Sequence, residues 1–177
     1  MIDRGALILG RREGQRYRGI RRETLDGMTL RGSGSGALRA RYREAVVAGE
    51  GVVEDLDEAL DMADHARRLG AEVEVVVFEV PHAQEAAGVG PGSGVRGALA
   101  VLSPPPAEGL LCLGWDLVEP IEPWWSPLSA DPAPDARLNP YGLFDTRAEA
   151  ERFAAVGPWD LDEPLVAARI WVSADPG

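Results

Sequence analysis

The chain has 177 residues, 45% of them hydrophobic, and it carries 18 Arg, no Lys and 29 acidic residues for a net charge of −11. A chain of this length buries one hydrophobic core. No apolar run approaches the roughly 20 residues of a membrane span, so we expect a cytoplasmic protein that does not enter a membrane. The single cysteine, Cys112, excludes an internal disulfide, and its apolar neighbours predict a buried thiol.

The charge is divided unevenly along the chain. Residues 1–43 hold 11 Arg and four acids, for a net charge of +7, whereas residues 44–177 hold seven Arg and 25 acids, for −18. A charge asymmetry of this kind indicates which partners the protein can bind, and it does not indicate its fold. We therefore divide the chain into a basic N-terminal segment (1–31), a Gly/Ser linker (32–36) and a single acidic domain (37–177).

The N-terminal segment has the pattern of a β-hairpin. The short apolar run 6–9 is followed by a turn near Gly14 and by the roughly alternating residues 16–21. This pattern predicts a hairpin with an Arg-rich face. After the linker, apolar residues recur at helical spacing over 37–48, and Gly49 is expected to end that helix.

Two further elements of the acidic domain have clear boundaries. Asp55 and Glu58 form an acidic variant of a capping box, which predicts a helix that ends near Gly70. The run 73–80 is too apolar for an exposed edge and predicts a strand near the middle of a sheet. Another strand is predicted over residues 110–118.

Proline excludes a helix or a central strand from residues 119–140, because nine of the 14 prolines fall between residues 104 and 140. Thr146 and Glu149 then form a second capping box, which predicts a helix to about residue 155. A final strand is predicted over 165–172. This order of elements predicts an α+β fold with a mostly antiparallel sheet, about three helices, the N-terminal hairpin and a long Pro/Trp-rich loop.

The Pro/Trp-rich loop is the segment most typical of a binding surface. Aromatic side chains on a stiffened loop lose little conformational entropy on binding, and neighbouring carboxylates favour a basic protein partner. The alternative is that the loop folds back and its tryptophans fill the core. The candidate partner-binding residues are Trp115, Asp116, Glu119, Glu122, Trp124, Trp125 and Tyr141.

The Arg-rich front, which is the part of the basic N-terminal segment from Arg11 to Arg22, is a second candidate surface. Its arginines can neutralise phosphates, and Tyr17 can stack on a base, but the charge of −18 on the remaining chain repels nucleic acid. The favoured interpretation is docking onto the acidic body of the same or a neighbouring chain, which includes self-association; solvated charge is the third interpretation. The candidate basic patch is Arg11, Arg12, Arg16, Arg18, Arg21 and Arg22.

No motif predicts a cofactor or a metal site. A P-loop requires a Lys, which this chain lacks, and neither Gly-rich stretch has the spacing of a dinucleotide fingerprint. Glu58, Asp61 and His65 share one face of a predicted helix, where a solvated charged face is a simpler explanation than metal ligation. We therefore predict no cofactor and no metal.

The stretch 113–118, the turn 126–129 and the stretch 138–144 before a capped helix form a pattern of hydrophobic residues and turns. This pattern resembles small bacterial proteins, and some acidic proteins of that kind are immunity proteins that neutralise a toxin. The resemblance implies a protein-binding role, and it carries no functional residue over to this chain.

These features lead us to expect a non-enzymatic protein-binding module, an immunity or regulatory protein whose acidic aromatic loop binds a basic protein. Two alternatives stay open. One is a small enzyme whose carboxylates act in a cleft between residues 83–106 and 115–135. The other is a nucleic-acid-associated protein that uses the Arg-rich front.

Overall fold

The structure, a computed structural model, describes residues 4–11, 22–48, 51–80, 108–118, 126–129, 137–157 and 165–173. In these residues six antiparallel strands and three α-helices give the predicted α+β fold. No helix in these ranges is long and apolar enough to cross a membrane. The elements are β1 (Arg4–Gly10), α1 (Ser35–Ala45), β2 (Val46–Ala48), β3 (Val52–Val53), α2 (Leu56–Arg68), β4 (Val73–Glu79), β5 (Leu110–Val118), the 3-10 turn η2 (Pro127–Ser129), α5 (Arg147–Val156) and β6 (Val166–Ser173).

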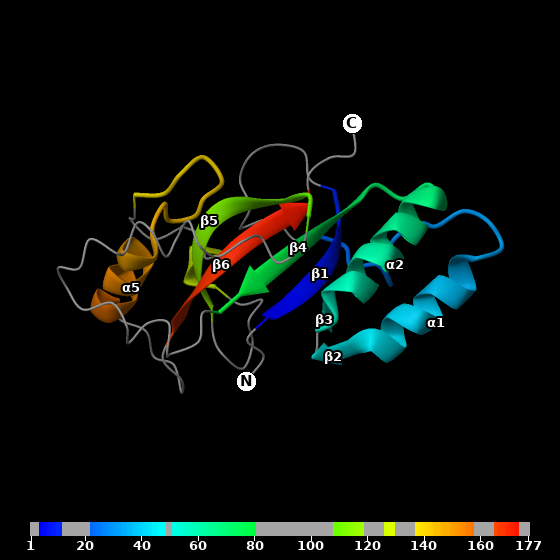
Figure 1. The fold of residues 1–177 in the computed structure, drawn as a ribbon, viewed down its shortest axis with the longest axis horizontal. Helices are drawn as coiled ribbons and strands as arrows, with labels where there is room; N and C mark the ends of the chain where they lie inside the picture. Colours follow the sequence, from blue (N-terminus) through cyan, green and yellow to red (C-terminus); the bar gives the residue numbers. More distant parts are fainter. Residues whose placement is uncertain are drawn as a thin grey trace.

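The strands form one sheet in the order β2-β3-β1-β4-β6-β5 (Figure 1). β1 pairs with β4 along its whole length, from Arg4 opposite Glu79 to Gly10 opposite Val73, and it also pairs with β3. The first strand of the basic segment and the acidic domain therefore share this sheet. The predicted second arm of the hairpin, residues 16–21, lies outside the described residues.

Helices cover the sheet at two places (Figure 1). α2 packs against β4 and β1 with α1 beside it, whereas α5 packs against β5 and β6 at the other end of the sheet. Side chains alternate between the two faces of a strand, so Ile8 and Val75 join the α2 cluster while Leu7 and Val76 join the α5 cluster. Each fully buried large aliphatic side chain stabilises the fold by about 1.5–3 kcal/mol.

The first helix differs from its predicted bounds. α1 begins at Ser35, inside the predicted linker, and ends at Ala45, because Val46–Ala48 form the strand β2. The β-branched residues Val46 and Val47 favour an extended backbone, and β2 pairs with β3. The structure thus shortens the predicted helix at its end and uses part of the Gly/Ser stretch as its first turn.

Both capping predictions are confirmed. The Asp55 carboxylate accepts a hydrogen bond of 3.0 Å from the Glu58 amide at the start of α2, and Thr146 with Glu149 form a reciprocal capping box at the start of α5. α2 ends before Gly70, whose φ of 81° suits glycine. The predicted strands 73–80 and 110–118 match β4 and β5, and β4 is an interior strand.

The prediction for Cys112 was wrong, because its side chain is exposed. β5 is the last strand of the sheet, and Leu111 beside Cys112 is also exposed. An apolar sequence context predicts burial only when another element covers both faces of the strand.

Tyr42 makes stability depend on alkaline pH. Burial raises the pKa of its phenol above the ordinary value of 10.0, and a hydrogen bond with Thr24 lowers it in part. A raised pKa means that the folded state prefers the neutral phenol, so its contribution is complete below pH 10.0 and is lost as pH rises through the folded pKa. We expect the urea midpoint of wild type to fall more steeply above about pH 10 than that of Tyr42→Phe. Equal slopes would contradict this prediction, and Tyr141→Phe, at an exposed tyrosine, is the control.

Candidate functional site

Residues 139–142 form a tight turn ahead of α5. The Gly142 amide donates to the Asn139 carbonyl at 2.9 Å, and the Asn139 amide donates to the Leu143 carbonyl at 2.8 Å. The side-chain oxygen of Asn139 accepts from the amides of Tyr141 at 2.9 Å and Leu143 at 3.2 Å. Tyr141, the third residue of this turn, is 39% exposed. The turn thus presents an aromatic side chain from a backbone held by several hydrogen bonds.

This tyrosine turn, residues 139–142, is attached to β5. Asn139 Nδ2 donates to the Leu113 carbonyl at 2.8 Å, and Trp115 and Phe144 exchange two backbone hydrogen bonds of 2.8 and 2.9 Å. Gly114 lies between these contacts with a φ of 139°, and a Cβ there would lie 2.7 Å from the Phe144 carbonyl oxygen. Glycine is therefore required for this close approach.

Trp115 is half-buried on β5 and contacts a charged side chain of the sheet. The guanidinium carbon of Arg169 lies 4.9 Å from the centroid of the Trp115 ring and 5.6 Å from that of Trp171. Trp171 Nε1 in turn donates to Glu79 at 3.3 Å. Stacking of this kind contributes about 0.5–2 kcal/mol. The Trp115 ring therefore stabilises the sheet, and the residue stays partly exposed.

Asp116 is fully buried, which corrects its predicted place on a partner-binding surface. Its carboxylate accepts hydrogen bonds from the Leu117 amide at 2.8 Å and from the Ser126 hydroxyl at 2.5 Å. The Ser126 oxygen accepts from the Leu128 amide at 3.1 Å, and the Leu128 side chain is 1% exposed. Asp116 therefore fixes η2 to β5.

The described parts of the long Pro/Trp-rich loop are both attached to β5. Residues 126–129 are held through Asp116, and residues 137–144 are held through Asn139. Of the predicted surface residues, the structure leaves Tyr141 exposed beside this strand. The other four candidates, Glu119, Glu122, Trp124 and Trp125, lie outside the described residues.

Asn139 was missed as a functional candidate by the sequence analysis. Its signal was the order Asn-Pro-Tyr-Gly, since a type I turn favours Asn at the first position, Pro at the second and Gly at the fourth. That pattern predicts a turn, but it says nothing of the Leu113 carbonyl, which lies 26 residues earlier in the chain.

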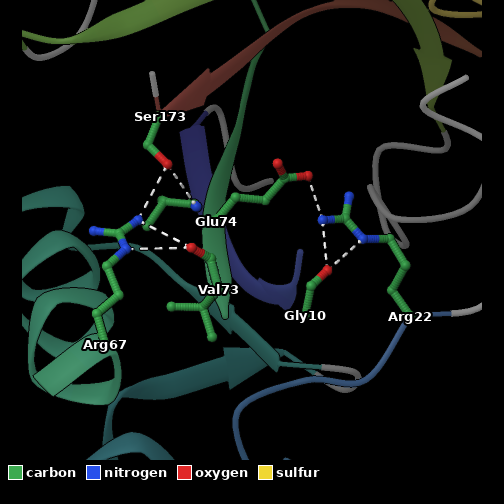
Figure 2. Close-up of polar contacts among 7 residues, drawn as sticks. Gly10, Arg22, Arg67, Val73, Glu74 and Ser173 are labelled. Atoms are coloured by element: carbon green, nitrogen blue, oxygen red, sulfur yellow. Dashed lines mark hydrogen bonds and ion pairs between the residues drawn. The ribbon is translucent and has the colours of Figure 1, made fainter. Parts of the chain in front are cut away.

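The Arg22 side chain is buried against the sheet, so it is not part of an exposed basic patch and instead docks on the acidic domain of the same chain. Figure 2 shows its guanidinium between Gly10 and Glu74. Nε and Nη2 donate to the Gly10 carbonyl at 3.0 and 2.8 Å, and Nη2 pairs with the Glu74 carboxylate. The Arg22 side chain is only 7% exposed. Arg11 is exposed, and Arg12, Arg16, Arg18 and Arg21 lie outside the described residues.

A second arginine, Arg67 of α2, contacts the same end of β4 (Figure 2). Its Nε and Nη2 donate to the Val73 carbonyl at 3.2 and 3.1 Å, and Nη2 also donates to Ser173 Oγ at 3.4 Å. Ser173 Oγ accepts from the Val75 amide at 3.0 Å. Arg22 and Arg67 together fix the beginning of β4 to β1 and β6.

Two arginines of α1 pair with acidic residues of the same chain. Arg41 pairs with Glu58 at 3.1 Å and Asp61 at 2.5 Å, and Arg43 pairs with Asp26 at 2.8 Å. The hydrogen bond from Arg41 lowers the pKa of Asp61, and the hydrogen bonds to Asp61 and Glu58 raise the pKa of Arg41. The predicted acidic face of α2 thus pairs with α1. In the part of the chain that the structure describes, no three His, Cys, Asp or Glu side chains are placed to hold a metal ion.

β5 and the tyrosine turn together form the candidate functional site. Comparisons of the chain with protein-family models, with curated proteins and with solved structures found no match.

Proposed function

We propose that this chain is a non-enzymatic protein-binding module that presents the tyrosine turn to a basic protein partner. The observation that carries the proposal is the exposed Tyr141 on a turn whose backbone is fixed by Asn139 and attached to the sheet. Tyrosine supplies a large contact area with few rotatable bonds, and it is enriched among the residues that dominate binding energies.

The charge of the chain supports a basic partner. The net charge is −11, and residues 119–136 contain four acids and no Arg. Opposite charges on two partners accelerate their encounter and disfavour wrong partners. We include Glu119, Glu122, Trp124 and Trp125 in the proposed surface on the basis of their sequence, and we leave out the buried Asp116.

An immunity or regulatory role in the cytoplasm is the biological form of this proposal. A protein of this kind acts by covering the surface of another protein, so it requires a rigid, exposed recognition element. The tyrosine turn meets that requirement, and the acidic composition suits a basic toxin or a basic regulatory target.

The test is capture of a partner from a lysate of the source organism, followed by measurement of its Kd with purified variants. Tyr141→Ala is expected to weaken binding by about 2 kcal/mol, which is about a 30-fold rise in Kd, because truncation removes a central aromatic contact. The matched control is Val156→Ala, at an apolar side chain on α5 that is 80% exposed.

The proposal also requires binding to weaken as salt is raised, since charge attraction between exposed surfaces is screened. A partner whose Kd is unchanged by Tyr141→Ala, with the fold intact by circular dichroism, would show that the tyrosine turn lies outside the interface. Circular dichroism separates this outcome from loss of structure.

A further inference from the structure

We propose that Asn139 is the positioning residue of Tyr141 and that the irregularity in β5 exists to receive its side chain. The binding role in this inference rests on the proposed function, whereas the attachment of the turn can be tested in the free protein. The inference concerns how the recognition element is held before any partner arrives.

The oxygen and the nitrogen of the Asn139 side-chain amide make different contacts. Its oxygen accepts from the Tyr141 and Leu143 amides and so holds the turn itself. Its nitrogen donates to the Leu113 carbonyl and so joins the turn to β5. A short side chain that both accepts and donates in this way is characteristic of asparagine, since aspartate lacks the donor.

The strand is shaped to accept this contact. The register between β5 and β6 shifts between Cys112 and Gly114, so Leu113 has no partner residue in β6. A bulge of this kind locally disrupts the ladder and leaves the extra residue unpaired. In β5 the Leu113 carbonyl accepts the Asn139 hydrogen bond instead.

Gly114 provides the space beside that carbonyl. A Cβ at this position would lie 2.8 Å from Asn139 Nδ2 and 3.1 Å from the Leu143 Cβ. The absence of a side chain at Gly114 thus allows the asparagine to approach the strand. Bulges next to functional sites often re-aim a side chain, and here the bulge and the asparagine together fix the position of the turn.

The consequence for function is preorganisation. If the sheet fixes the tyrosine turn in the free protein, binding does not have to order it, and the affinity gained from Tyr141 is not spent on loop ordering. Asn139 then acts through Tyr141 and does not itself contact the partner.

The experiment compares wild type with Asn139→Ala, Asn139→Asp and the control Arg137→Ala, at an exposed residue of the same segment. In the free protein, the backbone order parameter of Tyr141 is expected to fall from about 0.85 to below about 0.6 in both Asn139 variants. Exchange of the Leu143 amide is expected to rise by about 10-fold or more in Asn139→Ala, and less in Asn139→Asp, because aspartate keeps the acceptor.

Exchange of the β4 amides at Val75–Val77 should stay unchanged in all variants, which separates a local effect from global destabilisation. Unchanged order at Tyr141 in Asn139→Ala would overturn the attachment.

The binding role is tested with the captured partner. Asn139→Ala should raise the Kd of this partner by about 10-fold. If Tyr141→Ala weakens binding and a loosened turn does not, the positioning role is wrong. If Tyr141→Ala has no effect while Asn139→Ala still loosens the turn, the proposed function fails and the attachment stands.

Discussion

Replacing Glu74 by Met is expected to lower the free energy of unfolding by about 3 kcal/mol. Glu74 neutralises Arg22, whose side chain is 7% exposed, so the substitution leaves a buried guanidinium with only the Gly10 carbonyl as a described partner. Removing one member of a buried ion pair costs about 3–5 kcal/mol, and the 23% exposure of the Glu74 side chain places the effect at the lower end of that range. Urea denaturation at neutral pH measures it.

The double variant Arg22→Met with Glu74→Met identifies the cause. Two apolar side chains leave no unpaired charge, so most of the lost stability is expected to return. Among the described residues, Arg22 Nη1 has no hydrogen-bond partner even in wild type, so within this part of the chain the native pair is incompletely satisfied. A double variant as unstable as the sum of the two single variants would contradict this account. Glu151→Met, in an exposed pair with Arg147, is the control and should cost less than about 1 kcal/mol.

The elements that could be predicted from the sequence are those specified by neighbouring residues. Thr146 and Glu149 contain the whole capping box of α5 within four positions, and Asp55 with Gly70 limits α2 in the same local way. The continuous apolar run of β4 also specifies its interior position. In each case the physical cause lies within one turn or one strand.

Pairing between distant segments could not be predicted in this way. β1 lies between β3 and β4. Nothing in residues 4–10 specifies these two neighbours, because strand pairing depends on the packing of the whole sheet. The same applies to Val46, which continues a helical pattern in sequence but pairs with Val53 of β3 in the structure. Strand pairing, together with the β propensity of valine, prevailed there over the helical spacing of the apolar residues.

Charged side chains that are buried show the same limit. Asp116 and Arg22 are charged residues, and such residues are usually exposed. Each is buried because a partner distant in sequence, Ser126 for one and Glu74 for the other, satisfies it. The sequence carries no local signal for either pair. By contrast, the turn residues around Tyr141 indicate locally that this tyrosine lies in an exposed turn.

Gly114→Ala is expected to destabilise the protein by about 4 kcal/mol, although it adds one methyl group. The φ of 139° is unfavourable for any residue with a Cβ. The new methyl would also lie 2.7 Å from the Phe144 carbonyl oxygen, so the Trp115–Phe144 pair must separate and lose two backbone hydrogen bonds. The measurement is the free energy of unfolding from urea denaturation.

Gly109→Ala measures the cost of a positive φ without a close contact, because Gly109 has a φ of 78° and an added Cβ there would meet no atom of the described residues within 4 Å. Backbone strain alone should cost about 1–2 kcal/mol at that position. The excess at Gly114 then contains the close approach of the tyrosine turn to β5 and the greater strain of a φ of 139°. Equal losses at the two glycines would mean that the turn moves away from the strand at little cost, and the close contact at Gly114 would then not be what holds the turn. A loss at Gly114 above the roughly 3 kcal/mol that backbone strain alone costs would instead show that the bulge, the turn and α5 beyond it are held together through one position without a side chain.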